Sequence, residues 1–195
     1  MPTLDSFVEG LRGLAEGTFD EETVHRYIRD NPVEPATLAP YLHYRPTHYT
    51  RNLVFKCDVF ELIAICWDVG QVSRIHNHAG QRCWMAVPIG RLAVQNYRVV
   101  RQDVATGFCK LEEAHRVEMD PAHPAYVEQE LPVHSVLNPR EYGARATSLH
   151  LYSAPYDHCL VYTPEKSSYC EVPLFYDTEY GRPAAGSRTP GRSED

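Results

Sequence analysis

The sequence lacks any apolar stretch that approaches the ~20 residues needed to cross a bilayer as a helix. It also lacks a secretion signal, because residues 1–16 are acidic and amphipathic and have neither a basic start nor an apolar centre. These two absences predict a protein that does not associate with membranes and that is located in the cytoplasm.

Basic residues are scarce. The chain has 19 Lys and Arg against 26 Asp and Glu, which gives a formal net charge of -7. Proteins that bind nucleic acid neutralise phosphates with an excess of Lys and Arg. Because that excess is missing, we expect no nucleic-acid partner.

Cysteine pairs with the CxxC spacing of redox or zinc motifs are also missing. The cysteines are scattered, and no signal directs the chain to an oxidising compartment. We therefore expect free thiols rather than disulfides at Cys57, Cys66, Cys83, Cys109, Cys159 and Cys170.

No internal repeat of about 20 to 50 residues is visible, and 195 residues, 43% of them apolar, suit one globular domain. Near the C-terminal end, residues 181–195 contain no large apolar side chain. Burial therefore cannot offset the entropy lost when such a segment becomes ordered. We expect residues 177–195 to form a disordered tail.

Residues 1–40 are predicted to form a helical segment that packs on the rest of the chain. Apolar residues recur at spacings of three and four in residues 4–14 and 24–28, and Asp20 is suited to cap the second of two short helices. Residues 41–176 contain short β-branched and aromatic runs separated by turn residues, which is typical of a sandwich or a jelly-roll β-barrel. Strands are expected at 49–57, 59–67, 82–88, 91–101, 115–119, 125–130, 133–138, 145–153 and 157–163.

His76 and His78 are two residues apart, so on a strand both imidazoles project from one face and can share a metal ion. Taken alone the pair is a weak signal, because two nearby histidines are also common on surfaces and in cores. The glycines at fixed distances before and after the pair strengthen the interpretation of the two histidines as a metal site. The spacing Gly70-x5-His76-x-His78-x4-Cys83-x6-Gly90 resembles the first cupin motif, with Cys83 where most cupins have a glutamate ligand.

His134 and Asn138 resemble the second cupin motif, which supplies one more histidine and then an asparagine. The upstream part departs from the motif, since Gln129 and Leu131 stand where Pro and Gly are usual. A site of three histidines without a carboxylate suits catalytic zinc, and it differs from the common iron site of two histidines and one acid. The type of ligand alone leaves the choice between iron and zinc open.

A second cluster of polar residues lies in a strand with strict alternation. Ser148, His150 and Tyr152 lie on one face, and two leucines lie on the other. A hydroxyl, an imidazole and a phenol in a row can pass hydrogen bonds along and hold the phenol proton over a site. The alternative is a polar ladder on an exposed sheet face.

Tyr49 and Arg51 likewise share a face, just before an apolar stretch. An inward guanidinium is costly unless a carboxylate meets it. The pair therefore predicts an anionic substrate.

Together, these pieces resemble the cysteine dioxygenase family of thiol dioxygenases over about residues 49–162. The resemblance implies a cupin-type jelly-roll β-barrel, with short N-terminal helices, that holds one Fe(2+) per chain. The implied metal ligands are His76, His78 and His134.

The resemblance also implies roles for the other residues. Arg51 and Tyr49 are implied to bind the substrate carboxylate, and Cys83 and Tyr152 are a pair that this family can join by a thioether bond. The residues implied to orient the tyrosine are Ser148 and His150.

We therefore expect a monomeric enzyme of cysteine catabolism that oxidises L-cysteine with O2 to L-cysteine sulfinic acid. The nearest alternative is the same reaction on 3-mercaptopropionate or another small thiol, although a carboxylate clamp argues against cysteamine. Two alternatives from other classes are a non-enzymatic cupin that binds a metal or small ligand and a zinc-dependent isomerase. Neither alternative explains why Arg51 is present, or why Ser148, His150 and Tyr152 share one face of a strand.

Overall fold

The computed structural model describes residues 1–184. The helices span Leu4–Ala15 (α1), Glu21–Asp30 (α2), Pro35–Tyr41 (η1), Arg140–Tyr142 (η2) and Pro164–Lys166 (η3), the last three of the 3-10 type. The strands span Thr50–Lys56 (β1), Glu61–Trp67 (β2), Ile75–His76 (β3), Cys83–Ile89 (β4), Leu92–Asp103 (β5), Phe108–Met119 (β6), Ala125–Tyr126 (β7), Val133–Leu137 (β8), Ala146–Tyr152 (β9), His158–Thr163 (β10), Ser168–Pro173 (β11), Thr178–Glu179 (β12) and Arg182–Pro183 (β13).

The two predicted N-terminal helices are present, and local sequence explains where each begins. Thr3 caps α1, because its hydroxyl oxygen accepts a hydrogen bond from the backbone N–H of Ser6. Asp20 caps α2 in the same way through Thr23. Such caps satisfy backbone donors that have no partner inside the helix.

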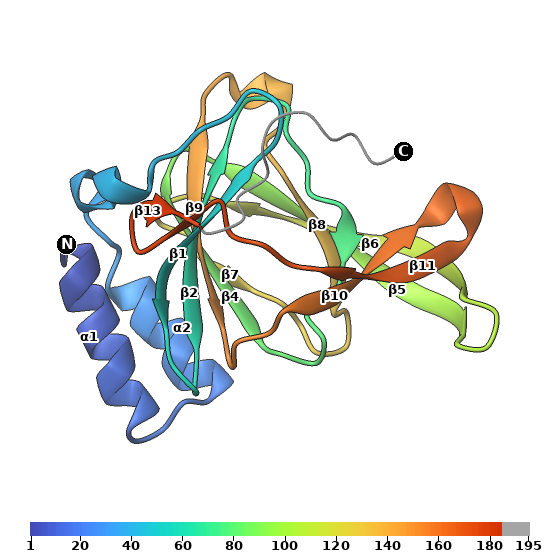
Figure 1. Cartoon of the computed structure of the whole chain (residues 1–195), viewed down its shortest axis with the longest axis horizontal. Helices are drawn as coiled ribbons and strands as arrows, with labels where there is room; N and C mark the ends of the chain where they lie inside the picture. The colour runs from blue at the N-terminus through green and yellow to red at the C-terminus, as the bar shows by residue number, and fades with distance from the viewer. Residues whose placement is uncertain (185–195) are drawn as a thin grey trace.

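The strands form two layers. One sheet has the order β13-β12-β1-β2-β9-β4-β7, and the strands β10, β11, β6, β5, β8 and β3 close into a hydrogen-bonded ring. Apolar side chains from both layers meet in one buried cluster that includes Ile63, Met85, Val94 and Val136. The space between the layers is therefore the core of the β body, with the long β5 and β6 strands extending away from the helices (Figure 1).

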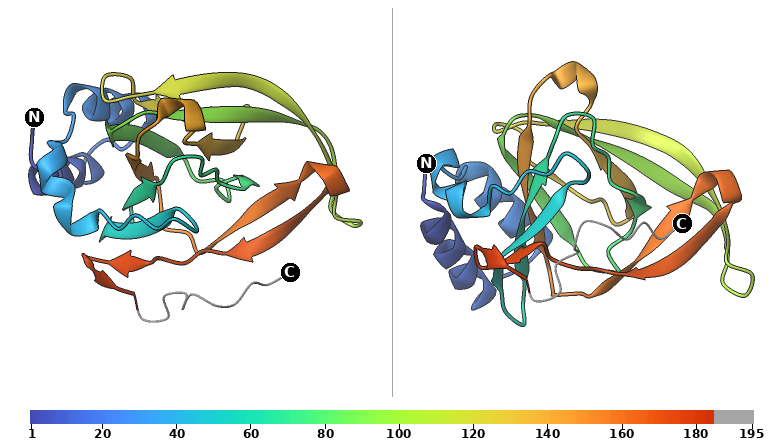
Figure 2. Two further views of the ribbon diagram at one scale, coloured as in Figure 1. Left: turned by 90° about the horizontal axis from the view of Figure 1, so that it is seen from above. Right: turned by 45° about the horizontal axis from the view of Figure 1, so that its top comes forward.

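The helices cover the outer face of the seven-stranded sheet. Side chains such as Phe7 and Ile28 pack with Leu62, Leu149 and Leu151 in a second buried cluster. Figure 2 shows α1 and α2 on one side of the molecule, next to this sheet. The strands β2 and β9 are consequently buried along their whole length, with one face toward the helices and the other toward the ring.

Several expected boundaries were wrong. β6 begins earlier than the expected strand at 115–119, and the strands β3, at Ile75–His76, and β11 were not expected. The expectation of a disordered tail from residue 177 is also wrong for its first part, because β12 pairs in parallel with β1, and β13 pairs with β12. Tertiary pairing supplies partners that local composition does not indicate. The rest of that tail, 185–195, lies outside the described residues.

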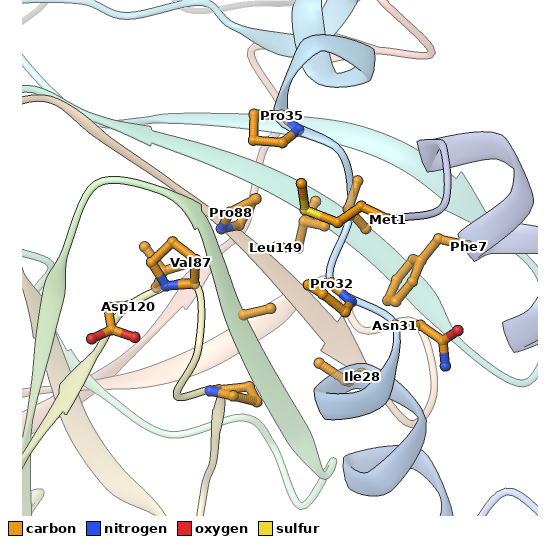
Figure 3. A pocket seen from close by; sticks show the side chains of 14 residues that line it. Met1, Phe7, Ile28, Asn31, Pro32, Pro35, Val87, Pro88, Asp120 and Leu149 are labelled. Carbon is orange, nitrogen blue, oxygen red and sulfur yellow. The ribbon is translucent and has the colours of Figure 1, made fainter.

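A mostly apolar pocket of about 190 Å³ lies between the N-terminal segment and the outer face of the sheet (Figure 3). Met1, Phe7 and Ile28 line one side of the pocket, and Val87 and Leu149 line the other. None of the predicted site residues line it, and the sheet separates it from the inner face of β9.

As expected, all six cysteines are free. Within residues 1–184, no helix is both long enough and apolar enough to cross a membrane.

Candidate metal and substrate site

Three histidines from two distant segments converge between the two layers. His76 ends β3 and is paired in register with His134 on β8, and His78 lies in the turn that follows β3. Ring centroids are 4.8 Å apart for His76 and His134 and for His78 and His134, and 5.2 Å apart for His76 and His78. Each residue offers one ligand atom, and these atoms all lie within 4.8 Å of one another.

The protonation state of the three imidazoles suits metal binding. Burial lowers the pKa of His76 to about 4 and holds the pKa values of His78 and His134 well below the usual range. The rings are therefore neutral at pH 7, which is the form that binds metals.

The ring nitrogens of His78 and His134 are buried and have no hydrogen-bond partner among residues 1–184. His76 is different, because its Nδ1 lies 2.8 Å from the backbone oxygen of Arg74. Since Nδ1 donates that bond, the lone pair of Nε2 is free to bind a metal. Buried, unpartnered lone pairs that converge on one point are what a divalent cation requires, so these residues fit a metal ion.

The predicted turn glycines hold the segments that carry the histidines. Gly70 has φ +85° and Gly90 has φ +78°, values in the left-handed region that glycine favours. Gly70 donates its backbone N–H to the oxygen of Asn138 at 2.8 Å. The side chain of Asn138 in turn donates to the backbone oxygens of Trp67, Asp68 and Ala144. The asparagine of the second motif therefore ties neighbouring loops together.

A chain of hydrogen bonds leads along the inner face of β9. Trp67 Nε1 donates to the Ser148 hydroxyl at 2.9 Å, and the same oxygen lies 2.9 Å from His150 Nε2. Ser148 is fully buried, so its own proton needs an acceptor, and His150 Nε2 is the acceptor available among the described residues. The ring proton of His150 then sits on Nδ1, 3.4 Å from the phenol oxygen of Tyr152.

In this direction of donation Tyr152 accepts from His150, and its own phenol proton can be donated to the neighbouring Tyr156 hydroxyl or to a bound molecule. The imidazole of His150 and the phenol of Tyr152 are both uncharged at neutral pH. Burial and the charge of Arg51 lower the pKa of His150 to about 3, and burial raises the pKa of Tyr152 well above its usual value. The row can therefore present a neutral hydrogen-bond donor to a bound molecule.

Arg51 lies on β1 with its guanidinium among the aromatic residues of the site. Its charge interacts with Tyr152, Tyr156, Tyr49 and Glu61, and its Nε and Nη2 are buried without a hydrogen-bond partner among residues 1–184. Buried charged donors without an acceptor are costly, so this group is suited to receive an anion.

The backbone of Arg51 is held from both sides by one residue of the C-terminal segment. Arg51 donates its N–H to the Asp177 carboxylate at 2.9 Å, and the backbone N–H of Asp177 donates to the Arg51 oxygen at 2.7 Å. Tyr49 stacks on the ring of Trp67, with centroids 4.6 Å apart. The residues that precede and begin β1 are thus fixed before any ligand binds.

Cys83 on β4 is the direct register partner of Tyr152 on β9. Such cross-strand partners have Cβ atoms ~4.5 to 5.5 Å apart, close enough for the two side chains to touch. Burial raises the pKa of the Cys83 thiol. Cys83 is therefore a neutral thiol beside the tyrosine and lies outside the histidine cluster.

Sequence analysis missed three residues that face this site: Trp67, Tyr156 and Glu61. Trp67 belongs to none of the motifs described above, and it donates to Ser148. The ring of Tyr156 lies 4.9 Å from that of Tyr152, across a turn where strand alternation gives no guidance. Glu61 stands at the start of a strand buried on both faces, so no alternating pattern reveals which way it points.

The comparisons with known proteins agree with this geometry. The family model for cysteine dioxygenase type I matches residues 7–165. The chain belongs to this family. Cysteine dioxygenase type 1 of Rattus norvegicus is 30% identical over 161 residues, which cover 82% of this chain and 76% of the relative. The Homo sapiens protein is 29% identical over 181 residues, which cover 92% and 88%.

Solved structures align less closely. A cupin superfamily protein from Desulfitobacterium hafniense has a TM-score of 0.44 and 11% identity, over 63% of this chain and 92% of that chain. A protein from Thermus thermophilus has a TM-score of 0.43 and 17% identity, over 63% and 97%. The strand order confirms the expected mainly β barrel with short N-terminal helices. Membership of the dioxygenase family supports a thiol dioxygenase, and hence an enzyme.

Proposed function

We propose that this chain is a non-haem iron(II) dioxygenase that converts L-cysteine and O2 to L-cysteine sulfinic acid. One observation carries the proposal: three neutral imidazoles, each with a ring nitrogen free to bind a metal, lie together within the range of the charge of Arg51, whose Nε and Nη2 are buried without a partner among the described residues. A metal-binding group and a carboxylate-binding group side by side match a small substrate with a sulfur at one end and a carboxylate at the other.

His76, His78 and His134 are the residues that would hold the iron. Bound iron(II) supplies the unpaired electrons and open coordination positions that let dioxygen react with a thiolate. The reaction adds both atoms of one O2 to one sulfur and converts R–SH to R–SO2H, so it needs no further reductant.

The protein's own groups orient the substrate. Arg51 donates charge-assisted hydrogen bonds to the substrate carboxylate, with Tyr49 beside it, and so fixes the distance between the carboxylate and the metal site. Tyr152 directs its phenol proton toward the sulfur end, and Ser148 and His150 hold that orientation. Trp67 and Tyr156 close the aromatic wall that excludes water.

The proposal is tested with protein purified without added metal. We expect one iron per chain, oxygen uptake that is fastest with L-cysteine among cysteine, 3-mercaptopropionate and cysteamine, and one sulfinate formed per O2. Fastest uptake with 3-mercaptopropionate would reassign the substrate. Zinc in the site with no uptake, also after reconstitution with iron, would favour a non-enzymatic or zinc-dependent cupin.

We also propose that Cys83 and Tyr152 form a thioether during turnover, because the two residues are register partners. A bond between the sulfur and a ring carbon releases two hydrogen atoms, whose electrons reduce dioxygen. Intact mass measurement after turnover should therefore show a species lighter by two hydrogens. Cys83→Ser and Tyr152→Phe should lack that species, turn over more slowly and still bind iron. A fully active Tyr152→Phe variant would contradict the role of the phenol.

A further inference from the structure

His78 differs from the other two histidines of the cluster, because it lies outside the strands. His76 and His134 are register partners on β3 and β8, so the sheet fixes both of them. β3 ends at His76, and the ring nitrogens of His78 have no hydrogen-bond partner among the described residues. The backbone of the turn after β3 must therefore set the position of the His78 imidazole.

This turn has a conformation that is unfavourable for its sequence. Ala79, directly after His78, has φ +51°, and Gly80 has φ +82°. The left-handed region suits glycine, but a residue with a Cβ is strained there. A backbone hydrogen bond from the N–H of Gln81 to the oxygen of His78, at 2.9 Å, closes the turn. Such a strained conformation persists only where neighbouring groups hold it.

The side chain of Asn77 supplies contacts that hold the turn. Its Oδ1 accepts a hydrogen bond from the backbone N–H of Leu160 at 3.0 Å and a longer one from the N–H of Ala79 at 3.4 Å. A side-chain hydrogen bond also links Asn77 to Tyr162. Because Oδ1 is already the acceptor, the amide nitrogen of Asn77 donates this bond to the phenol oxygen. Asn77 thus ties the histidine turn to β10, at a residue 83 positions further along the chain.

These contacts explain how the chain can leave the sheet just before His78. The β3–β10 ladder ends with the pair His76 and Val161, so Asn77 faces Leu160 as the next pair. The N–H of Asn77 donates to the Leu160 oxygen at 3.1 Å, as in a regular antiparallel pair. The return bond, from the N–H of Leu160, is accepted by the side chain of Asn77. The side chain therefore takes the place of a backbone acceptor and leaves the backbone free to turn.

We propose that Asn77 is a positioning residue of the metal site, whose side chain holds the turn so that the imidazole of His78 is in place before a metal binds. The inference rests on the proposed function, because it needs the three histidines to be metal ligands. Asn77 itself is given no contact with the metal or the substrate. If the turn were loose, metal binding would have to order it, and the cost of that ordering would weaken the affinity.

The test measures metal affinity and the mobility of the turn in Asn77→Ala, which removes both the acceptor and the donor. The dissociation constant for iron(II), and separately for zinc(II), is measured without oxygen by competition with a chelator. It should rise by about ten- to a hundred-fold, as is usual when a residue that orients a metal ligand is lost. In the metal-free protein, the backbone amides of Ala79 and Gln81 should exchange hydrogen faster, whereas those of the buried strand β9 should not.

Two further substitutions divide the contacts of Asn77. Asn77→Asp keeps an acceptor for Leu160 and Ala79 and should keep most of the affinity; a loss as large as in Asn77→Ala would overturn the inference. Tyr162→Phe removes only the hydroxyl that receives the amide, and it should weaken metal binding by about three- to tenfold, which corresponds to the loss of one hydrogen bond. If Asn77→Ala does not fold, Tyr162→Phe takes its place in the test.

Asn31→Ala is the matched control. Asn31 is also a half-buried asparagine, and its side chain donates to the Tyr27 backbone oxygen at 2.9 Å at the end of α2. Its loss should lower the free energy of unfolding without changing the dissociation constant of the metal. A merely structural role of Asn77 would give that same result. An unchanged dissociation constant in Asn77→Ala, or in Tyr162→Phe where it serves as the substitute, therefore overturns the inference.

Metal binding also separates this inference from the proposed function. If the unmodified protein binds iron but consumes no oxygen with any thiol, the proposed reaction fails, and the dissociation constants still test Asn77. If it consumes oxygen and Asn77→Ala binds iron as tightly as the unmodified protein does, only the inference fails. A protein that binds no metal at the three histidines would overturn both.

Discussion

At the scale of single residues, the site is a set of buried polar groups whose partners are incomplete. Most buried polar groups in proteins are hydrogen-bonded, so each exception needs an explanation. Here the exceptions include the ring nitrogens of His78 and His134 and the guanidinium of Arg51. Their positions explain them together, because a metal ion and a carboxylate would satisfy all three residues.

The first prediction concerns the guanidinium. Arg51→Ala should raise KM for cysteine by roughly ten- to a hundred-fold, with a smaller effect on kcat, because a charge-assisted pair contributes about 1.5 to 3 kcal/mol to binding. Oxygen uptake at varied cysteine concentration measures both constants. Arg101→Ala, at an exposed position on β5, is the control. An unchanged KM would show that the carboxylate binds elsewhere.

The second prediction concerns the donor chain to Tyr152. Trp67→Phe removes the donor to Ser148 while keeping an aromatic ring against Tyr49. It should lower kcat with little change in KM or iron content, because the hydrogen bonds that run from Trp67 to Tyr152 set the orientation of the phenol proton. Ser148→Ala should lower kcat in the same way, and the double variant should be no worse than the more impaired single variant, as expected for groups in one network. Fully additive losses would mean that the two residues act separately.

At the scale of elements, the turns decide where each strand presents its residues. Gly90 connects β4 to β5 with φ +78°, and a Cβ at this position would lie 2.6 Å from the backbone oxygen of Arg145. The turn therefore requires glycine for both conformation and space. A change here affects β4, which carries Cys83 at its other end.

Gly90→Ala should consequently destabilise the protein by about 1 to 3 kcal/mol, the usual cost of a strained backbone position, with more if the clash shifts β9. Gly13→Ala is the matched control, because Gly13 lies within α1 and an added Cβ meets nothing within 4 Å. It should stabilise the protein by about 0.5 to 1 kcal/mol, since glycine is unfavourable inside helices. Urea unfolding measures both changes, and equal stability of the two variants would refute the role given to the turn.

At the scale of the whole molecule, the buried histidines make stability depend on pH. The pKa values are lowered to about 4 for His76 and about 3 for His150, and they lie well below the usual range for His78 and His134. In the unfolded chain these rings take up protons near ~pH 6.5. The metal-free protein should therefore be most stable above that pH and lose stability as the pH falls toward the folded-state values.

Urea unfolding of the metal-free protein from about pH 8 to about pH 4.5 measures this effect. Each histidine that stays neutral in the folded state should cost about 2 kcal/mol at about pH 5. His150→Gln should make the slope shallower. A midpoint that does not change across this range would mean that these imidazoles are protonated in the folded protein.

Much of this molecule could be predicted from local sequence patterns. The helix caps at Thr3 and Asp20, the turn glycines and the alternation of β9 depend on neighbours within a few residues, so their physics is present in the chain itself. The spacing of His76 and His78 and the motif around His134 likewise predicted three histidines that the fold does bring together, with one possible ligand atom of each within 4.8 Å of the others.

Only the tertiary structure decided which other groups share that space. Trp67 and Glu61 lie on a strand buried on both faces, where periodicity carries no information about direction, and Tyr176 reaches Glu61 from 115 residues away. The order of β12, β1, β2 and β9 in one sheet puts these side chains beside Arg51 and Tyr152. Local patterns determine elements and motif ligands because they act over a few residues. The electrostatic surroundings of a buried site depend on which distant strands become neighbours.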